Sequence, residues 1–486
     1  MQNLLLLLLL LSLLSYVSGQ GYNCTGVQTI NPPANINNSY VYPATWDETT
    51  NPPQYASGQS CTWKIMVPKG MFAYFAMKAV TNKGAVLQMT DSTGYVTTFD
   101  IASFEPFFLM DPSFTVTLVS TNVGSMGLYV KWYNVKPVTT TSFVQVSANG
   151  SPQVLSIGDF DAGTTIQADS RVSLLSIPPP AQITDLTPYM RITQVFDGPT
   201  INSTLLGNLF QVMNSGRNLV SSGKYLTLYS LFSGFNIGSV AVAQDYFDVK
   251  QFNSYKAVWC LLPNLCDLSL DARNGTAAAL RYSPSPFYVK TISLPLNSKV
   301  SVYTDSPNDA HRLATYTLGN IQSDVPQKFR STFTTFALDL GQTVISLSSN
   351  TIDARWGIPF EGRSGFFASP YFPMYSAMQN FTDQIAGSQT FNISYTVKKA
   401  DLDNGAQLQV TIFDGQTTPI DNVYSSSNLP QGTVWSRGDN LLVKYIPGTA
   451  IRTGAYVDFH FGPYKSANAL NFLGAMIVTL WAALSL

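Results

Sequence analysis

The sequence predicts an all-β protein built of tandem antiparallel β-sandwich modules. Short runs with alternating apolar and polar residues recur along the chain, as in Phe114–Val119 and Leu408–Phe413. This period of two is typical of half-buried strands. Clusters of Gly, Asn, Asp and Pro separate the runs, and no long segment between the two termini has helical periodicity. Many short, evenly spaced strands favour sandwiches.

The N-terminus predicts a secretory signal peptide over residues 1–19. A leucine-rich run precedes Val17 and Gly19, which occupy the −3 and −1 positions of a small-residue cleavage site. The mature chain then starts near Gln20. The alternative is an N-terminal membrane helix, which needs a longer apolar span and charged flanks.

Roughly 450 residues lie between the two termini, enough for three or four modules of ordinary size. We place boundaries near 136–142, where a polar linker-like stretch runs from Lys136 to Ser142, near 248–256 and near 350–364. The predicted modules are β-sandwich domain 1 (20–136), β-sandwich domain 2 (142–250), β module 3 (251–350) and β-sandwich domain 4 (351–464).

Internal repeats support this division. A strand ends in Phe-Asp-Gly at 196–198 and again at 413–415, where Gly and Asp suit a tight turn. About 25 residues further on, Gly223 and Gly438 each precede another strand, so one supersecondary plan recurs. The stretch 251–350 fits the repeat least well. We interpret it as a third β module or as the first half of a larger unit with the fourth.

Four cysteines remain in a chain that the signal peptide directs to an oxidising compartment. They allow three pairings, and sequence proximity favours Cys24 with Cys61 and Cys260 with Cys266. The last two lack the paired spacing and nearby histidines of a zinc site.

The composition predicts a glycosylated extracellular surface. Charged residues make up only 11% of the chain, against roughly 25% in an average soluble domain, so something else must hydrate the surface. Seven acceptor triplets for N-linked glycans provide this, the weakest being the one followed by Pro152. The acceptors are Asn23, Asn37, Asn149, Asn202, Asn274, Asn380 and Asn392. The near-neutral net charge of −1 argues against nucleic acid, because no basic stripe faces phosphates.

The C-terminal tail predicts a glycosylphosphatidylinositol (GPI) anchor on the extracellular face of the plasma membrane. Residues 470–486 are apolar and uncharged, yet shorter than the roughly 20 residues of a spanning helix and without a basic flank. Small residues precede the tail, and Ser466 and Asn468 are the candidate attachment residues within the predicted signal 466–486. The alternatives are a single C-terminal transmembrane helix or a buried strand.

Two sets of residues resemble the CUB family of extracellular β-sandwiches. The first module has Cys24, then Tyr42-Pro43, then Cys61-Thr-Trp63-Lys-Ile65, and the last has Gly-Phe-Phe-Ala-Ser-Pro-Tyr-Phe-Pro at 365–373. With the signal peptide and tail, the chain is similar to the expanded CUB-like secreted proteins of nematodes. The resemblance implies extracellular recognition of proteins or glycans, at the cell surface and in innate defence.

The family's calcium site is not expected here. Many CUB domains bind calcium through a Glu and two Asp residues, but the matching strands read Ala406-Gln407 and Tyr189-Met190. Asp401, Asp403 and Asp414 lie in the right region of the last module, and we interpret them as turn residues. Neither a metal nor another cofactor is predicted.

No catalytic site is predicted, so the chain is not expected to be an enzyme. The only histidines are His311 and His460, and the only glutamates are Glu48, Glu105 and Glu361. Nothing in the sequence brings two glutamates together, and neither histidine has a clear triad partner. Phosphate-loop and zinc-protease motifs are missing from the sequence.

Most of the abundant aromatic residues are expected to fill cores, with Trp63 and Trp132 on inward strand positions. The aromatic stretch 365–373 is interpreted as a module-opening turn, the alternative being an exposed edge that binds sugars or proteins. The sequence thus predicts a cell-surface binding or adhesion protein with an extracellular protein or glycan ligand. The alternative is a glycosylated structural coat without a specific ligand.

Overall fold

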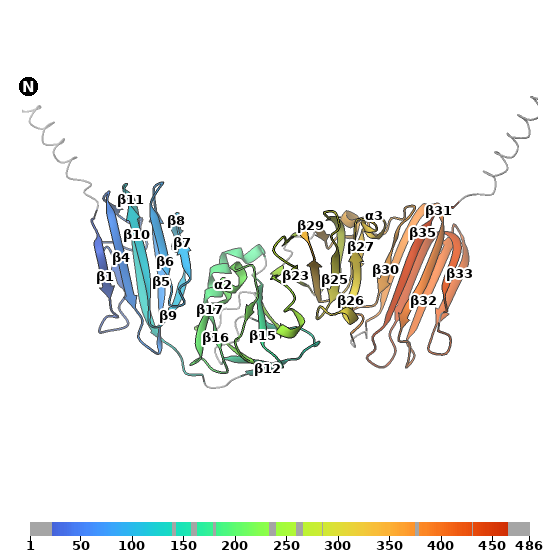
Figure 1. The fold of residues 1–486 in the computed structure, drawn as a ribbon, viewed down its shortest axis with the longest axis horizontal. Helices are drawn as coiled ribbons and strands as arrows, with labels where there is room; N and C mark the ends of the chain where they lie inside the picture. The colour runs from blue at the N-terminus through green and yellow to red at the C-terminus, as the bar shows by residue number, and fades with distance from the viewer. Residues whose placement is uncertain are drawn as a thin grey trace, which may run out of the picture. The chain divides into compact units, whose positions relative to one another are not determined.

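The computed structural model describes residues 22–138, 142–156, 163–177, 181–232, 240–258, 266–283, 285–374, 379–429 and 431–464. Strands dominate these residues and helices are short (Figure 1), which confirms the predicted all-β class of tandem sandwich modules. The first two modules form one compact unit and the last two form another, to which segments 146–152 and 216–218 also belong.

The first module is a sandwich of two sheets. One sheet has the strand order β1-β4-β10-β6-β7. The other has the order β2-β11-β5-β8, with β3 on β11 and β9 on β5. The strands are β1 (Thr25–Ile30), β2 (Tyr40–Tyr42), β3 (Gln54–Tyr55), β4 (Gln59–Met66), β5 (Met71–Val80), β6 (Val86–Thr90), β7 (Val96–Thr98), β8 (Ile101–Ser103), β9 (Phe107–Met110), β10 (Ser113–Ser120) and β11 (Gly124–Asn134).

The core of this module forms where the alternating strands turn their apolar sides inward. Trp63 on β4 and Trp132 on β11 are both buried, as predicted. The indole Nε1 of Trp132 donates a hydrogen bond of 2.8 Å to the Met66 carbonyl oxygen, which satisfies its polar group inside the core.

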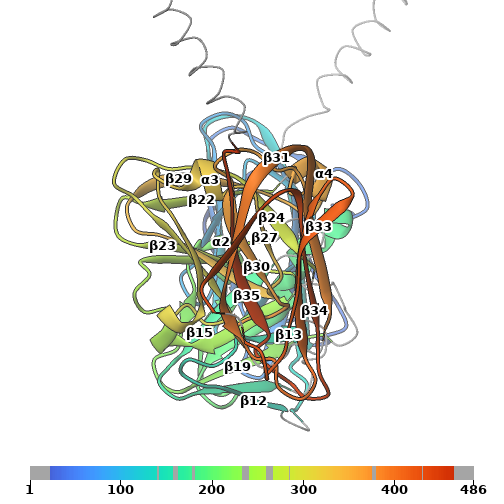
Figure 2. The same ribbon diagram turned by 90° about the vertical axis from the view of Figure 1, so that its right-hand side faces the viewer.

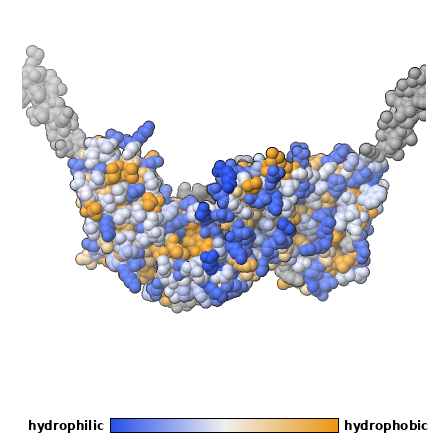
Figure 3. Space-filling view, in the orientation of Figure 1, coloured by the Kyte–Doolittle hydropathy of each residue, from blue (hydrophilic) through white to orange (hydrophobic). Residues whose placement is uncertain are grey.

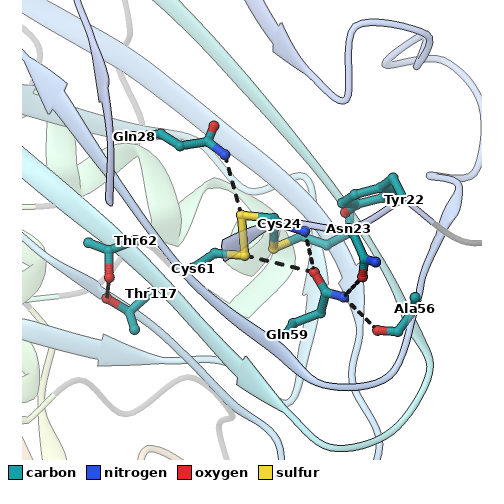
Figure 4. Close-up of a disulfide and its surroundings, with 10 residues drawn as sticks. Tyr22, Asn23, Cys24, Gln28, Ala56, Gln59, Cys61, Thr62 and Thr117 are labelled. Carbon is teal, nitrogen blue, oxygen red and sulfur yellow. Dashed lines mark hydrogen bonds between the residues drawn. A yellow bond between two sulfur atoms is a disulfide. The ribbon is translucent and has the colours of Figure 1, made fainter. Parts of the chain in front are cut away.

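A disulfide joins Cys24, just before β1, to Cys61 on β4, so this predicted pairing is confirmed. The two strands run parallel. Figure 4 shows the Gln59 side chain beside the disulfide, where its oxygen accepts from the Cys24 amide at 2.8 Å and its nitrogen donates to Asn23 at 2.9 Å. Closing this loop contributes about 3–4 kcal/mol on the chain-entropy account.

The second module has the sheets β12-β14-β19-β16-β17 and β13-β20-β15-β18. Its elements are β12 (Ser142–Val146), β13 (Gln153–Ser156), β14 (Thr164–Ala168), β15 (Val172–Ile177), the 3-10 helix η2 (Ala181–Ile192), β16 (Thr193–Asp197), β17 (Thr204–Asn208), α2 (Leu209–Asn214), β18 (Leu219–Val220), β19 (Tyr225–Ser230), β20 (Val240–Asp245) and η3 (Tyr246–Asp248).

The third module has the sheets β21-β23-β28-β25-β26 and β22-β29-β24-β27. Its elements are β21 (Ser254–Val258), β22 (Cys266–Ala272), β23 (Ala277–Tyr282), β24 (Phe287–Ser293), β25 (Val300–Thr304), η4 (Asp309–His311), β26 (Arg312–Tyr316), α3 (Ile321–Asp324), β27 (Gln327–Phe329), β28 (Phe333–Leu338) and β29 (Gly341–Ser348). Helix α4 (Thr351–Ala354) follows.

These three modules share one strand plan. The five-stranded sheets correspond position by position: β1, β4, β10, β6 and β7 match β12, β14, β19, β16 and β17, and they match β21, β23, β28, β25 and β26. The second sheets match likewise. Residues 251–350 thus keep the strand plan, although the Phe-Asp-Gly signal of the sequence repeat is missing there.

The fourth module keeps the plan in a merged form. Its strands are β30 (Ser364–Ala368), β31 (Phe381–Ala400), β32 (Gln407–Asp414), β33 (Thr417–Tyr424), β34 (Thr433–Ile446) and β35 (Ala455–Gly462). They form one sheet in the order β30-β35-β31-β34-β32-β33 (Figure 2). The expected two-sheet sandwich is thus replaced by one continuous sheet.

Long strands explain the merger. The register of β31 shifts between Ala386 and Phe391, so its first part pairs with β34 alone and its second part with both β34 and β35. In the first module the positions of these two parts are taken by two separate strands, β4 and β5, one in each sheet. Buried residues from both parts, such as Ile385 and Ile393, belong to one core cluster, so the sheet folds over a single core. Gly438 lies at the matching bend of β34, where a Cβ would come within 2.5 Å of the Phe413 carbonyl oxygen.

The Phe-Asp-Gly repeats lie at equivalent places, at the ends of β16 and β32. The Asp197 carboxylate accepts from the Ser222 amide at 2.9 Å, and Asp414 pairs with Arg437 at 3.0 Å. Asp91 and Asp305 follow the equivalent strands of the other two modules, β6 and β25. An aspartate at this turn is therefore common to all four modules, although the sequence motif showed only two.

Candidate ligand-binding groove

A groove of about 410 Å³ lies in the second unit, between the third and fourth modules. Strand β26 and helix α3 line one side, and strands β30 and β35 line the other. Its polar and aromatic lining includes Tyr316, Asp324, Gln327, Ser364, Tyr456 and Asp458. The volume falls in the range of small-ligand sites, roughly 300–1,000 Å³.

Gln327 fixes one wall of the groove to the other. Its side-chain nitrogen donates to the Phe366 carbonyl oxygen at 2.8 Å, and its side-chain oxygen accepts from the Phe366 amide at 3.1 Å. Phe366 stacks on Tyr456 with ring centroids 4.9 Å apart, and the Tyr456 hydroxyl donates to the Leu313 carbonyl oxygen at 3.0 Å. The walls are thus held by directional contacts as well as by apolar packing.

A buried charge cluster reinforces the same junction. The Asp383 carboxylate on β31 lies 2.8 Å from Nζ of Lys328 on β27. It lies 2.6 Å from the guanidinium of Arg330, the residue that follows β27. All three side chains are at least 86% buried. Such a cluster persists only where geometry is fixed, since each charge loses its water.

The groove carries two carboxylates. Burial, and after it the neighbouring charge of Asp324, raise the pKa of Asp458, while Lys398 acts in the opposite direction from 3.6 Å. Asp324 is held by the Asn320 amide at 2.9 Å and by the Ser323 hydroxyl at 2.7 Å. Two carboxylates that line one groove attract a cationic ligand.

Tyr316 lines the groove with an unsatisfied hydroxyl. The side chain is 1% exposed, and its oxygen has no hydrogen-bond partner in the part of the chain that the structure describes. Burial raises the pKa of this phenol, which therefore stays protonated and able to donate. A buried polar atom without a partner costs about 1–3 kcal/mol.

The aromatic stretch 365–373 packs inside the protein and does not form an exposed binding edge. Phe366, Phe367 and Phe372 are all buried, which agrees with the module-opening interpretation and excludes the alternative. Phe366 and Phe372 pack into the core of the third module. Only the start of β30 reaches the groove.

The imidazole of each histidine hydrogen-bonds to a serine. His460 Nδ1 is 2.9 Å from the Ser364 hydroxyl, a pair that sequence reasoning missed because 96 residues separate the two. His311 Nδ1 contacts Ser306 at 3.0 Å. No carboxylate within the described ranges hydrogen-bonds to either imidazole.

The aspartates considered for calcium are engaged by arginines. Arg452 approaches Asp401 at 3.8 Å and Asp403 at 3.9 Å, while Arg437 pairs with Asp414. Among the residues that the structure describes, no three His, Cys, Asp or Glu side chains gather as metal ligands.

The three glutamates lie at separate places in the fold. Glu105 Oε2 lies 3.3 Å from Arg191, a pairing inside the first unit. Glu48 is half-buried in the same unit, and Glu361 is exposed in the other.

All seven glycan acceptors have exposed side chains: Asn23, Asn37, Asn149, Asn202, Asn274, Asn380 and Asn392. Several predicted features lie outside the described residues, namely the signal peptide, Cys260 as the partner proposed for Cys266, Ser466 and Asn468. Within the described ranges, no helix is long and apolar enough to cross a membrane. On the face in Figure 3, apolar residues occur as patches among polar ones.

Three of the four modules each match the model of a known domain family. Residues 19–136 match the CUB-like domain. Residues 145–231 and 247–350 each match a domain of unknown function, DUF7592 and DUF7591 respectively. The CUB-like domain is typically an extracellular protein-interaction module. No curated protein matches the chain in sequence.

Solved structures with some similarity include CUB-containing fragments. The CUB1-EGF-CUB2 domain of human MASP-1/3 is 9% identical with a TM-score of 0.19, covering 41% of this chain and 100% of its own. The corresponding rat MASP-1 domains are 11% identical with a TM-score of 0.19, covering 45% and 100%. The extracellular region of zebrafish Gpr126/Adgrg6 is 11% identical with a TM-score of 0.18, covering 68% and 54%.

Proposed function

We propose that this chain, whose residues 19–136 match the CUB-like domain, is a non-enzymatic extracellular binding protein. Its groove between β26, α3, β30 and β35 takes a basic side chain of a protein ligand. The observation that carries the proposal is that two carboxylates, Asp324 and Asp458, line the same groove, and the Asp458 side chain is 41% exposed. A lysine or arginine in the groove would form charged hydrogen bonds with them.

The ion pair between Lys398 and Asp458 is weak enough for a ligand cation to replace Lys398. This side chain is 53% exposed and reaches Asp458 only at 3.6 Å. An exposed pair of this kind contributes about 0–1 kcal/mol, so a ligand cation that reaches the groove competes with it easily. The aromatic rings of Tyr456 and Phe366 add a surface for the aliphatic part of a lysine or arginine.

We further propose that the protein acts at the cell surface, held by a GPI anchor, and serves recognition in innate defence. The uncharged C-terminal tail with small residues before it supports the anchor. A phospholipase specific for phosphatidylinositol, applied to intact expressing cells, should release the protein into the medium. Retention on cells that release a known anchored control would contradict the anchor.

A structural coat is the second candidate. The seven acceptor asparagines are exposed and spread over all four modules, so glycans at these sites would hydrate much of a weakly charged surface. A coat needs no saturable ligand and should tolerate loss of the groove's carboxylates.

Binding of a basic peptide tests the groove directly. Protein purified from expressing cells is titrated calorimetrically with a lysine-bearing peptide and with the same peptide carrying norleucine. We expect saturable binding of the lysine peptide only, weakened by about tenfold or more in Asp458→Asn and Asp324→Asn, because charged hydrogen bonds contribute about 1.5–3 kcal/mol.

Asp267→Asn is the matched control, since Asp267 is exposed on β22 and contacts only Ser346. Equal weakening in this control would indicate unspecific charge attraction. Binding without saturation would favour the coat, whereas turnover of a substrate by the purified protein would overturn the non-enzymatic assignment.

A further inference from the structure

The outer face of the fourth module places a glycan acceptor next to an exposed tryptophan. On paired strands β31 and β34, Asn392 lies opposite Arg437, and Ser394 lies opposite Trp435. Ile393 is buried while Asn392 is exposed, so alternate residues of β31 face outward. The acceptor asparagine, the serine of its triplet and Trp435 therefore share one face.

Trp435 differs from the other tryptophans that the structure describes. It is 72% exposed, whereas Trp46, Trp63, Trp132 and Trp356 are 6% exposed or less. An indole ring carries one of the largest apolar areas of any side chain. Trp435 is the third residue of β34, in the part of that strand that pairs with β31 but not with β32, and it leaves this apolar area open to solvent.

The register of β31 and β34 places the glycan acceptor Asn392 beside this ring. Diagonal cross-strand neighbours lie roughly 7–8 Å apart, within reach of long side chains, and Trp435 is the diagonal neighbour of Asn392. Asn392 Nδ2 donates one hydrogen to the Pro463 carbonyl oxygen at 2.8 Å. The second amide hydrogen is the one that glycosylation replaces, so the Pro463 contact is compatible with a glycan.

Arg437, directly opposite the acceptor, has partners of its own. Its guanidinium pairs with Asp414 at 3.0 Å and lies 4.8 Å from the ring centroid of Tyr464. These contacts engage both the arginine and the Tyr464 ring, which is 37% exposed, whereas the indole of Trp435 is 72% exposed.

We propose that the first N-acetylglucosamine of a glycan on Asn392 stacks on the indole of Trp435 and shields this face of the sheet. The proposal rests on glycosylation of Asn392 and is independent of the groove. The amide nitrogen forms a bond to C1 of the sugar and loses a proton, while the pyrophosphate of a lipid-linked oligosaccharide leaves. The apolar C–H side of the sugar then replaces water on the ring.

A thermal double-mutant cycle tests the contact. The full chain is produced in glycosylating cells as wild type, Trp435→Ala, Asn392→Gln and the double variant, and peptide mass spectrometry measures occupancy of Asn392. We expect Trp435→Ala to lower the melting temperature by about 2–4 °C when the glycan is present. In the Asn392→Gln background the same substitution should change it by less than about 1 °C.

Enzymatic trimming identifies the sugar that makes the contact. An endoglycosidase that leaves one N-acetylglucosamine should keep Trp435 protected from acrylamide quenching, whereas an amidase that removes the whole glycan should expose it. The fluorescence of Trp435 is obtained by subtracting that of Trp435→Phe. Asn274→Gln, which removes an acceptor from the turn between β22 and β23, is the control for losing a glycan elsewhere.

Three results would overturn the proposal. The first is an unoccupied Asn392 in the secreted protein. The second is an equal effect of Trp435→Ala in both backgrounds of the cycle. The third is self-association that depends on Trp435 in sedimentation experiments, with or without the glycan, which would assign the ring to an interface between copies.

Discussion

The two junctions inside the compact units are built on different physical principles. The first and second modules meet through an apolar cluster that includes Phe72, Phe108, Phe196 and Leu231. The third and fourth modules meet through buried charges around Asp383 as well as aromatic rings. Apolar burial is non-directional, whereas an ion cluster fixes one geometry.

The buried arginine at the first junction shows the contrast. Arg191 lies between the rings of Phe107 and Phe210, 3.9 and 4.0 Å from their centroids. Its carboxylate partner Glu105 is 49% exposed, so that pair keeps contact with water. At the second junction the carboxylate and both cations are buried, and a ligand groove with fixed walls lies beside them.

The largest effect is expected from Asp383→Ala. Removing the carboxylate leaves Lys328 and Arg330 buried without it, which should cost about 3–5 kcal/mol of stability in the second unit. Because the chain has several modules, urea unfolding should be followed by hydrogen exchange of β27 and β31 separately from the first unit. A loss below about 1 kcal/mol would contradict the contrast between the junctions.

A smaller loss is expected from Gln327→Met. The substitution leaves the Phe366 amide and carbonyl without their side-chain partner, at a cost of about 1–3 kcal/mol. Hydrogen exchange at β30 should accelerate. Gln342→Met on the exposed part of β29, where the amide bonds Asp271, is the matched control and should change stability by less than about 0.5 kcal/mol.

The loss of stability caused by Arg191→Met should be smaller still. Methionine keeps contact with both phenylalanine rings, and Glu105 remains solvated, so a loss of about 1–2 kcal/mol is expected from the guanidinium hydrogen bonds. Urea unfolding of the first unit measures it. A loss as large as that of Asp383→Ala would show that the first junction also depends on its charge.

The smallest effect concerns pH at the second junction. The folded-state pKa of Asp458 is raised by burial and by Asp324, so its charged form opposes folding. The contribution of Asp458 to the free energy of unfolding should rise slightly as the pH falls through the raised pKa. The affinity for the lysine peptide should fall over the same pH interval. Calorimetry of wild type and Asp458→Asn checks this, because a variant with an unchanged pH dependence of binding would exclude Asp458.

Local features of the fold were predictable and non-local ones were not. The alternation around Trp63, the proximity of Cys24 to Cys61 and the two Phe-Asp-Gly turns are signals contained within short stretches. They gave the sandwich class, one disulfide and the repeat. The third module escaped the repeat since its turn reads Thr-Asp-Ser at 304–306, although strand order there is the same.

The groove could not be predicted because its residues come from five elements of two modules. Gln327 and Phe366 are 39 residues apart, and Lys328 and Asp383 are 55 apart. Contacts over such separations follow from how modules pack, and the sequence carries no periodic signal for that. The aromatic stretch 365–373 did mark the junction, but as buried packing.

The merged sheet of the fourth module has a mechanical consequence. A pull on the chain at Tyr464 enters through β35, which is hydrogen-bonded to β30 on one edge and to β31 on the other. Strand β31 extends over 20 residues and also pairs with β34, so the load is shared across the sheet without passing through a connecting loop. Pulling β35 out of this module therefore requires its hydrogen bonds with β30 and β31 to break together.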